Sequence, residues 1–129
     1  MTQRILSVAY DESLLATRQM LLETHGYNVI SALGFTQAVS HCKTGGFDLF
    51  ILGHSISLAD KRELIKTFRT HCRAPILSLG RVDEELVESD FHVFADKPEK
   101  LIQSVAKIFD GNFQPSQPVR SMKRRNKAS

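Results

Sequence analysis

The sequence has 129 residues, 42% hydrophobic and 24% charged, which fits one globular domain with a substantial core. No apolar run approaches the roughly 20 residues of a membrane span, and the run after Arg4 is too short for a signal peptide. We therefore expect a cytoplasmic protein, in which Cys42 and Cys72 are reduced thiols. Residues 1–110 carry 12 Lys and Arg against all 14 Asp and Glu, whereas residues 111–129 carry five basic residues and no acid, so the basic balance belongs to the tail.

Short apolar runs alternate with helical hydrophobic spacing along residues 4–109. A short apolar run predicts a buried strand, whereas repeats near i, i+4 and i+7 predict one face of a helix. In chain order, the first half gives a strand Ile5–Ala9, a helix with Leu14, Leu15, Leu21 and Leu22 that stops at His25-Gly26, a strand Tyr27–Ala32, a helix with Ala38 and Val39 that ends near Gly45-Gly46, and a strand Leu49–Leu52.

The second half continues the alternation, and Pro98 stands where a helix tolerates proline in its first turn. It gives a helix with Leu64, Ile65 and Phe68, a strand Ile76–Leu79, a helix that begins at Asp83-Glu84-Glu85 and contains Leu86 and Val87, a strand His92–Ala95, and a helix with Leu101, Ile102, Val105, Ile108 and Phe109. Five strands alternating with five helices predict an α/β fold, a doubly wound parallel (βα)5 sheet over residues 1–110. Residues 111–129 are expected to be a linker and a disordered basic tail.

Four segments in this order resemble the response-regulator receiver domain of two-component signalling, a flavodoxin-like fold. They are Gly26–Val29 at the entry to the second strand, Asp48–Leu52 at the third, Ala74–Leu79 at the fourth and His92–Pro98 at the last. The last segment carries the aromatic residue and the Lys-Pro pair of that family, whose peptide bond is usually cis. The resemblance therefore implies a phosphorelay module whose site lies at the carboxyl ends of the strands.

The residues expected at that site depart from the family. A working receiver ends its first strand in two acids that help bind Mg²⁺, and Ala9 and Tyr10 stand there. Gly53 stands at the phosphoacceptor aspartate, Gly80 at the Ser or Thr that bonds the phosphoryl group, and Lys97 alone is kept. Because Mg²⁺ needs oxygen ligands and phosphoryl transfer depends on the metal, we expect a pseudo-receiver that is no enzyme and has lost Mg²⁺.

Several neighbouring residues allow a functional and a plain interpretation. Asp11 and Glu12 restore an acidic pocket if the first loop is shifted by one residue, but Asp11 also suits the cap of the first helix. His54 and Ser55 are alternative nucleophiles without an evident base, so surface loop residues are the favoured interpretation. Lys97 either reaches Asp11, points to solvent, or helps to bind a small anion.

Tyr10 is expected to fill the volume left at Gly53 and Gly80, with its hydroxyl toward Lys97 or Asp11, although it could equally turn outward. The pairs His41-Cys42 and His71-Cys72 raise the alternative of a zinc site between two helices. Adjacent residues of a helix point about 100° apart, which makes that alternative geometrically awkward.

The expected function is protein binding without phosphorylation, and a homodimer is an open alternative. Receivers commonly signal through the face of the fourth helix, last strand and fifth helix, which here includes Phe91, Phe94 and Lys97. Phe94 itself is expected to be a static core aromatic. Two further alternatives are an active receiver with an atypical acceptor and a nucleic-acid accessory protein that uses the tail. The basic residues of that tail are Arg120, Lys123, Arg124, Arg125 and Lys127.

Overall fold

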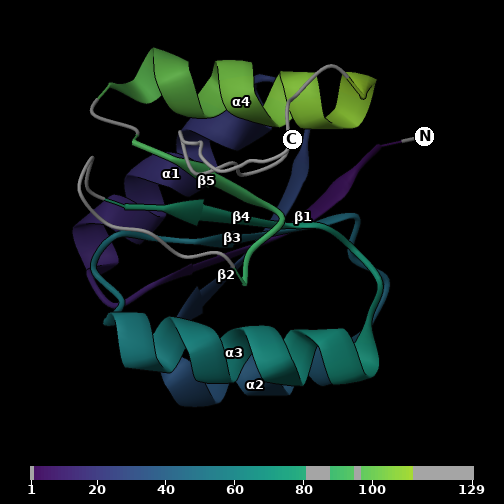
Figure 1. Cartoon of the computed structure of the whole chain (residues 1–129). Coiled ribbons are helices and arrows are strands. Elements are labelled where there is room, and N and C mark those ends of the chain that lie inside the picture. The colour runs from purple at the N-terminus through teal and green to yellow at the C-terminus, as the bar shows by residue number, and fades with distance from the viewer. Residues whose placement is uncertain (1, 81–87, 95–96, 112–129) are drawn as a thin grey trace, which may run out of the picture.

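Five parallel strands form one sheet in the order β2-β1-β3-β4-β5, which confirms the predicted doubly wound fold (Figure 1). The computed structural model describes residues 2–80, 88–94 and 97–111. The strands are β1 (Arg4–Ala9), β2 (Asn28–Leu33), β3 (Leu49–Leu52), β4 (Ile76–Leu79) and β5 (Phe91–Val93).

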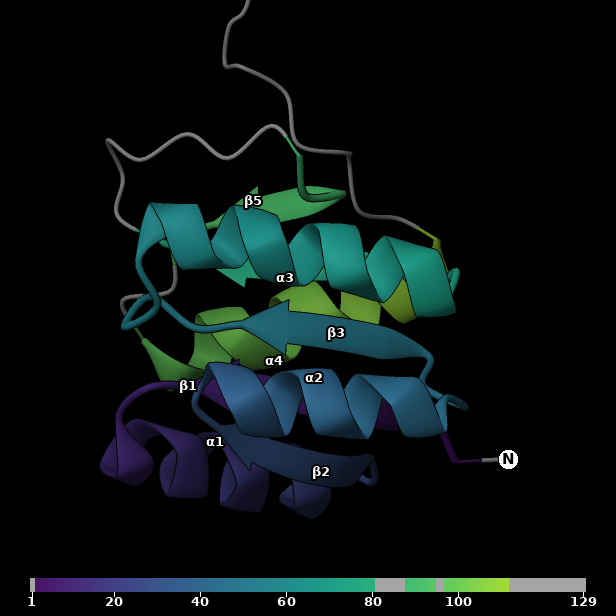
Figure 2. The ribbon, with the colours of Figure 1, turned by 90° about the horizontal axis from the view of Figure 1, so that it is seen from below.

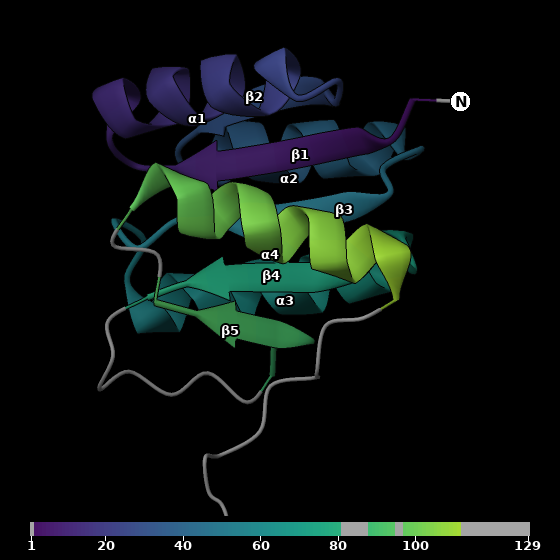
Figure 3. The ribbon, with the colours of Figure 1, turned by 90° about the horizontal axis from the view of Figure 1, so that it is seen from above.

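Among the described residues, two helices cover each face of the sheet. Helices α1 (Glu12–Thr24) and α4 (Pro98–Asp110) lie on one face (Figure 3), and α2 (Phe35–Thr44) and α3 (Leu58–His71) lie on the other (Figure 2). Pro98 stands in the first turn of α4, as the sequence predicts. The helix predicted from Asp83 and the tail predicted beyond Gly111 lie outside the described residues.

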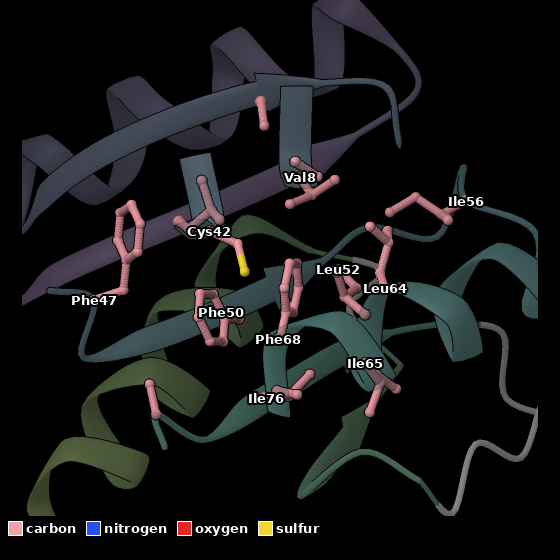
Figure 4. Packing of buried hydrophobic residues seen from close by; sticks show 14 residues of the cluster. Val8, Cys42, Phe47, Phe50, Leu52, Ile56, Leu64, Ile65, Phe68 and Ile76 are labelled. Carbon is pink, nitrogen blue, oxygen red and sulfur yellow. The ribbon is translucent and has the colours of Figure 1, made fainter. Parts of the chain in front are cut away.

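The side chains of β3 explain why its apolar run is continuous. Phe50 points toward α2 and α3, and its ring stacks on that of Phe68 with centroids 4.3 Å apart (Figure 4). Leu49 points to the other face and packs in a cluster with Leu101 and Val105 of α4. Both faces are therefore buried, as expected for a parallel sheet between two helix layers.

Three local expectations need correction. Strand β2 begins at Asn28 because the amide of Tyr27 still donates to the Leu22 carbonyl at the end of α1, at 3.2 Å. Strand β5 begins at Phe91, one residue earlier than predicted, where it pairs with Leu77. The described residues contain no cis peptide bond, so the cis Lys97-Pro98 bond implied by the resemblance is wrong.

Candidate functional site

The positions singled out from the sequence gather at one edge of the sheet. Ala9 ends β1 and Gly53 follows β3, and the Gly53 amide donates to the Val8 carbonyl at 2.9 Å. Gly80 follows β4 and donates to the Val93 carbonyl at 3.1 Å. We call Ala9, Tyr10, Gly53, Gly80 and Lys97 the strand-end site. It lies at the carboxyl ends of the strands, beside the β1–β3 pair from which the chain winds in both directions.

The side chain nearest to Gly53 is that of Arg18 of α1, a contact that the sequence alone does not reveal. A Cβ atom built at Gly53 would lie 2.5 Å from Arg18 Nη1 and 3.2 Å from the Val8 carbonyl oxygen. Arg18 is only 8% exposed, and burial lowers its pKa more than nearby Asp11 raises it. The space expected for an aspartate side chain therefore holds a guanidinium group.

Two features position the Arg18 side chain: its place on the buried face of α1 and its contact with the turn after β3. Its spacing from Leu15 and Leu22 places all three on the buried face of α1. Arg18 Nη2 lies 3.1 Å from His54 Nδ1, and because a guanidinium only donates, Nδ1 accepts. His54 is an exposed residue of a turn, as expected, but it has a partner that its sequence position did not reveal.

Tyr10 does not take the place that the sequence predicts. Its hydroxyl donates to Asp60 Oδ2 of α3 at 2.7 Å, and its amide donates to Ser55 Oγ at 2.9 Å. Burial, and then the hydrogen bond and charge of Asp60, raise the Tyr10 pKa. The expected contact with Lys97 or Asp11 is wrong, because Tyr10 packs on the α2–α3 side of the sheet.

Lys61 of α3 is a second basic residue that the sequence analysis missed. Its side chain is fully buried, and Nζ donates to Ser78 Oγ at 3.0 Å and to the Leu79 carbonyl at 2.8 Å. The sequence does carry a signal for its burial, because Lys61 shares the helical spacing of Leu64, Ile65 and Phe68. All four residues are buried in the structure. A buried cation thus reaches the end of β4 from the face opposite to α1.

Asp11 caps the first helix and Lys97 points to solvent, which are the plain interpretations of these two residues. Asp11 is exposed and caps α1, since its Oδ1 accepts from the Leu14 amide at 3.1 Å. Lys97 is the exposed cap residue of α4, and it makes no ion pair with any residue that the structure describes. The first loop therefore does not restore an acidic pocket through Asp11.

The strand-end site does not fit Mg²⁺. Ala9 and Tyr10 supply no carboxylate, and Gly53 supplies no side chain. Within residues 2–80, 88–94 and 97–111, there is no group of three or more His, Cys, Asp or Glu side chains that could hold a metal ion. Mg²⁺ is usually held by one or two carboxylates together with phosphate oxygens, and this edge instead presents basic groups.

The cysteines and Phe94 have other surroundings than expected of a zinc site or a core aromatic. Cys42 is buried with Sγ 3.9 Å from the Thr67 carbonyl, and Cys72 Sγ lies 3.8 Å from the Phe47 carbonyl.

Phe94 is 43% exposed, and Lys100 Nζ lies 5.6 Å from its ring centroid. The expectation of a core position for Phe94 is therefore wrong, because the residue directly follows β5 at the sheet edge.

Solved structures that superpose on this chain identify the architecture. A two-component response regulator from Clostridium difficile superposes with a TM-score of 0.73 at 18% identity, over 85% of this chain and 97% of that one. A CheY-like receiver domain protein from Methanospirillum hungatei gives 0.71 at 19%, over 87% and 97%. The response regulator TrrA from Thermotoga maritima, in complex with Mg²⁺-BeF, gives 0.66 at 23%, over 83% and 99%. The chain has the fold of a response-regulator receiver.

Two other comparisons complete this picture. No protein-family model and no curated protein matches the sequence. In the part of the chain that the structure describes, no helix is long and apolar enough to cross a membrane.

Proposed function

We propose that this chain is a pseudo-receiver of two-component signalling, which acts through protein contacts and is not phosphorylated. The observation that carries the proposal is Arg18 Nη1 beside Gly53, at the position where a receiver presents its acceptor carboxylate. An aspartyl phosphate needs that carboxylate and a metal held close to it. Neither requirement is met by Ala9, Tyr10 or Gly53.

The proposed contact surface is the face around β5 and the start of α4. Phe94 is a large exposed aromatic residue there, and Lys97 and Lys100 add exposed positive charge beside it. Exposed aromatic residues with neighbouring cations are enriched where proteins bind each other. One solved structure with this fold is a response regulator in complex with a histidine kinase, which makes a signalling protein the proposed class of partner.

The absence of phosphorylation is tested with acetyl phosphate and Mg²⁺, followed by intact-mass measurement. We expect an unchanged mass for this chain, while an active receiver domain in the same mixture gains one phosphoryl group. Joint replacement Tyr10→Asp and Gly53→Asp should introduce measurable Mg²⁺ affinity and lower the stability of the fold. A stoichiometric, acid-labile phosphate on the unaltered chain would contradict the proposal.

The contact surface is tested by crosslinking in cells that make the protein. We expect the Phe94→Ala variant to capture no partner. The control is Met20→Ala, which truncates a side chain of α1 that is 67% exposed and should still capture the partner. Equal capture by both variants would remove this face from the proposal.

A further inference from the structure

A cavity of about 220 Å³ opens between α1 and α4. Figure 3 shows how these two helices lie on one face of the sheet. Its walls combine leucines of α1, β4 and α4 with three basic side chains, Arg18, His54 and Lys97. No carboxylate is among the described residues that line it. We call this space the α1–α4 cavity.

Arg18 is a buried cation that has no counter-ion among the described residues around this cavity. Nη2 donates to His54, but Nη1 is buried and has no hydrogen-bond partner in the described structure. Asp11 is the acid whose charge reaches Arg18, yet it forms no ion pair with the guanidinium among the described residues and is engaged as the cap of α1. A buried guanidinium stays charged because its pKa is so high, and leaving it uncompensated is costly.

Two further positive groups converge on the same cavity. Lys97 lines it and precedes α4, whose first amides are not capped by the Lys97 side chain. The amino terminus of a helix carries partial positive charge and unpaired N–H groups, and α4 has 13 residues. Glu99 lies in this first turn, but it is exposed and does not line the cavity.

We propose that the α1–α4 cavity binds a small organic oxyanion, with its phosphate or carboxylate head between Arg18 and Lys97 and its apolar body against the leucines. A guanidinium matches the oxygens of either head group in a two-point geometry. Leu14 and Leu21 of α1 and Leu101 of α4 line this space and supply apolar walls. The inference goes beyond the proposed function, because it requires neither a protein partner nor a phosphodonor.

The test uses phenyl phosphate and phenylacetate as probes, with phenol as the probe that lacks a head group. Calorimetry on the full chain at fixed ionic strength should show saturable binding of at least one of the two anions and none of phenol. We expect Arg18→Met, which keeps an apolar stem of similar length, to weaken that binding at least tenfold. Lys97→Gln, at an exposed position that leaves the fold intact, should weaken it several-fold.

The matched control is Lys107→Gln in the last turn of α4, which removes one positive charge away from the cavity and should leave the affinity unchanged. This control separates the cavity from general attraction of anions to a basic chain. The proposal is overturned if neither anion binds saturably. It is also overturned if Lys97→Gln and a folded Arg18→Met bind as tightly as the unaltered chain.

Discussion

Gly53 and Arg18 form a matched pair in which a missing side chain makes room for a long one. Since a Cβ at position 53 would lie 2.5 Å from Arg18 Nη1, we expect Gly53→Ala to lower the free energy of unfolding by about 1–2 kcal/mol, as overpacking does. Urea unfolding should show a smaller loss in an Arg18→Ala background and an unchanged loss in a Lys107→Ala background. Equal losses in all three backgrounds would show that Arg18 does not occupy this space.

The Tyr10 hydroxyl ties the end of β1 to α3 through Asp60. We expect Tyr10→Phe to lower the free energy of unfolding by about 1 kcal/mol, the usual value of one hydrogen bond, or somewhat more because the acceptor is charged. Tyr27→Phe is the control, because Tyr27 packs on the Phe109 ring at 5.5 Å and its hydroxyl bonds no described residue. Thermal unfolding compares the two, and a loss no larger for Tyr10 would contradict the role of Asp60.

The residues at strand ends could be predicted, whereas the side chains that reach them could not. Ala9 ends one apolar run, and Gly53 and Gly80 directly follow two others, so a parallel sheet brings them to one edge. Arg18 and Lys61 are long and come from helices on opposite faces, so their reach depends on how those helices pack. A charged residue within an apolar helical stripe is the signal that could have found both.

At the scale of elements, Lys61 links α3 to β4. We expect Lys61→Ala to cost about 3 kcal/mol, because it leaves a cavity and removes the donor from buried Ser78 Oγ and the Leu79 carbonyl. Lys66→Ala on the same helix is the control, since its side chain is 77% exposed and its pair with Glu63 is a surface pair worth little. Chemical unfolding monitored by circular dichroism gives both values, and similar small losses would contradict the structural role of Lys61.

Element type could be predicted more securely than element boundaries. The run Leu49–Leu52 matches β3 to the residue, because both of its faces are buried and every side chain is apolar. The start of β2 was misplaced because Tyr27 is apolar yet belongs to the turn that ends α1. Strand β5 lies at the sheet edge with half-buried residues only, so hydrophobicity alone could not fix its ends.

For the molecule as a whole, the sign of charge at the strand ends is the opposite of what the resemblance implies. Residues 1–110 carry more acids than bases, yet Arg18 and Lys97 line one cavity near the ends of the strands, and Lys61 reaches the end of β4 from the opposite face. Two of these cations are buried, which fixes their positions more firmly than surface charges are fixed. The anion site that we propose therefore lies at the edge that holds a metal and a phosphoryl group in a working receiver.

The stability of the whole chain should fall in alkaline solution. Burial is the main cause that raises the pKa values of Cys42, Tyr10 and Tyr27, whose ordinary values are 9.0 and, for the tyrosines, 10.0. Each group therefore ionises in the unfolded chain before it does so in the folded one. The unfolded state then binds fewer protons above pH 9, and stability decreases as the pH rises. The lowered pKa of Arg18 has the opposite sign, but a guanidinium keeps its proton over this pH range and so adds nothing to the slope.

We expect the free energy of unfolding to fall by about 1–2 kcal/mol between pH 8 and about pH 10.5, measured by urea unfolding at constant ionic strength. The joint variant Tyr10→Phe and Tyr27→Phe cannot ionise at either position, so its stability should fall less over the same interval. Cys42 remains in that variant and accounts for the part of the slope that persists. A stability that stays level or rises, or an equal slope in both proteins, would contradict this account, because the three groups would then ionise alike in the folded and unfolded chains.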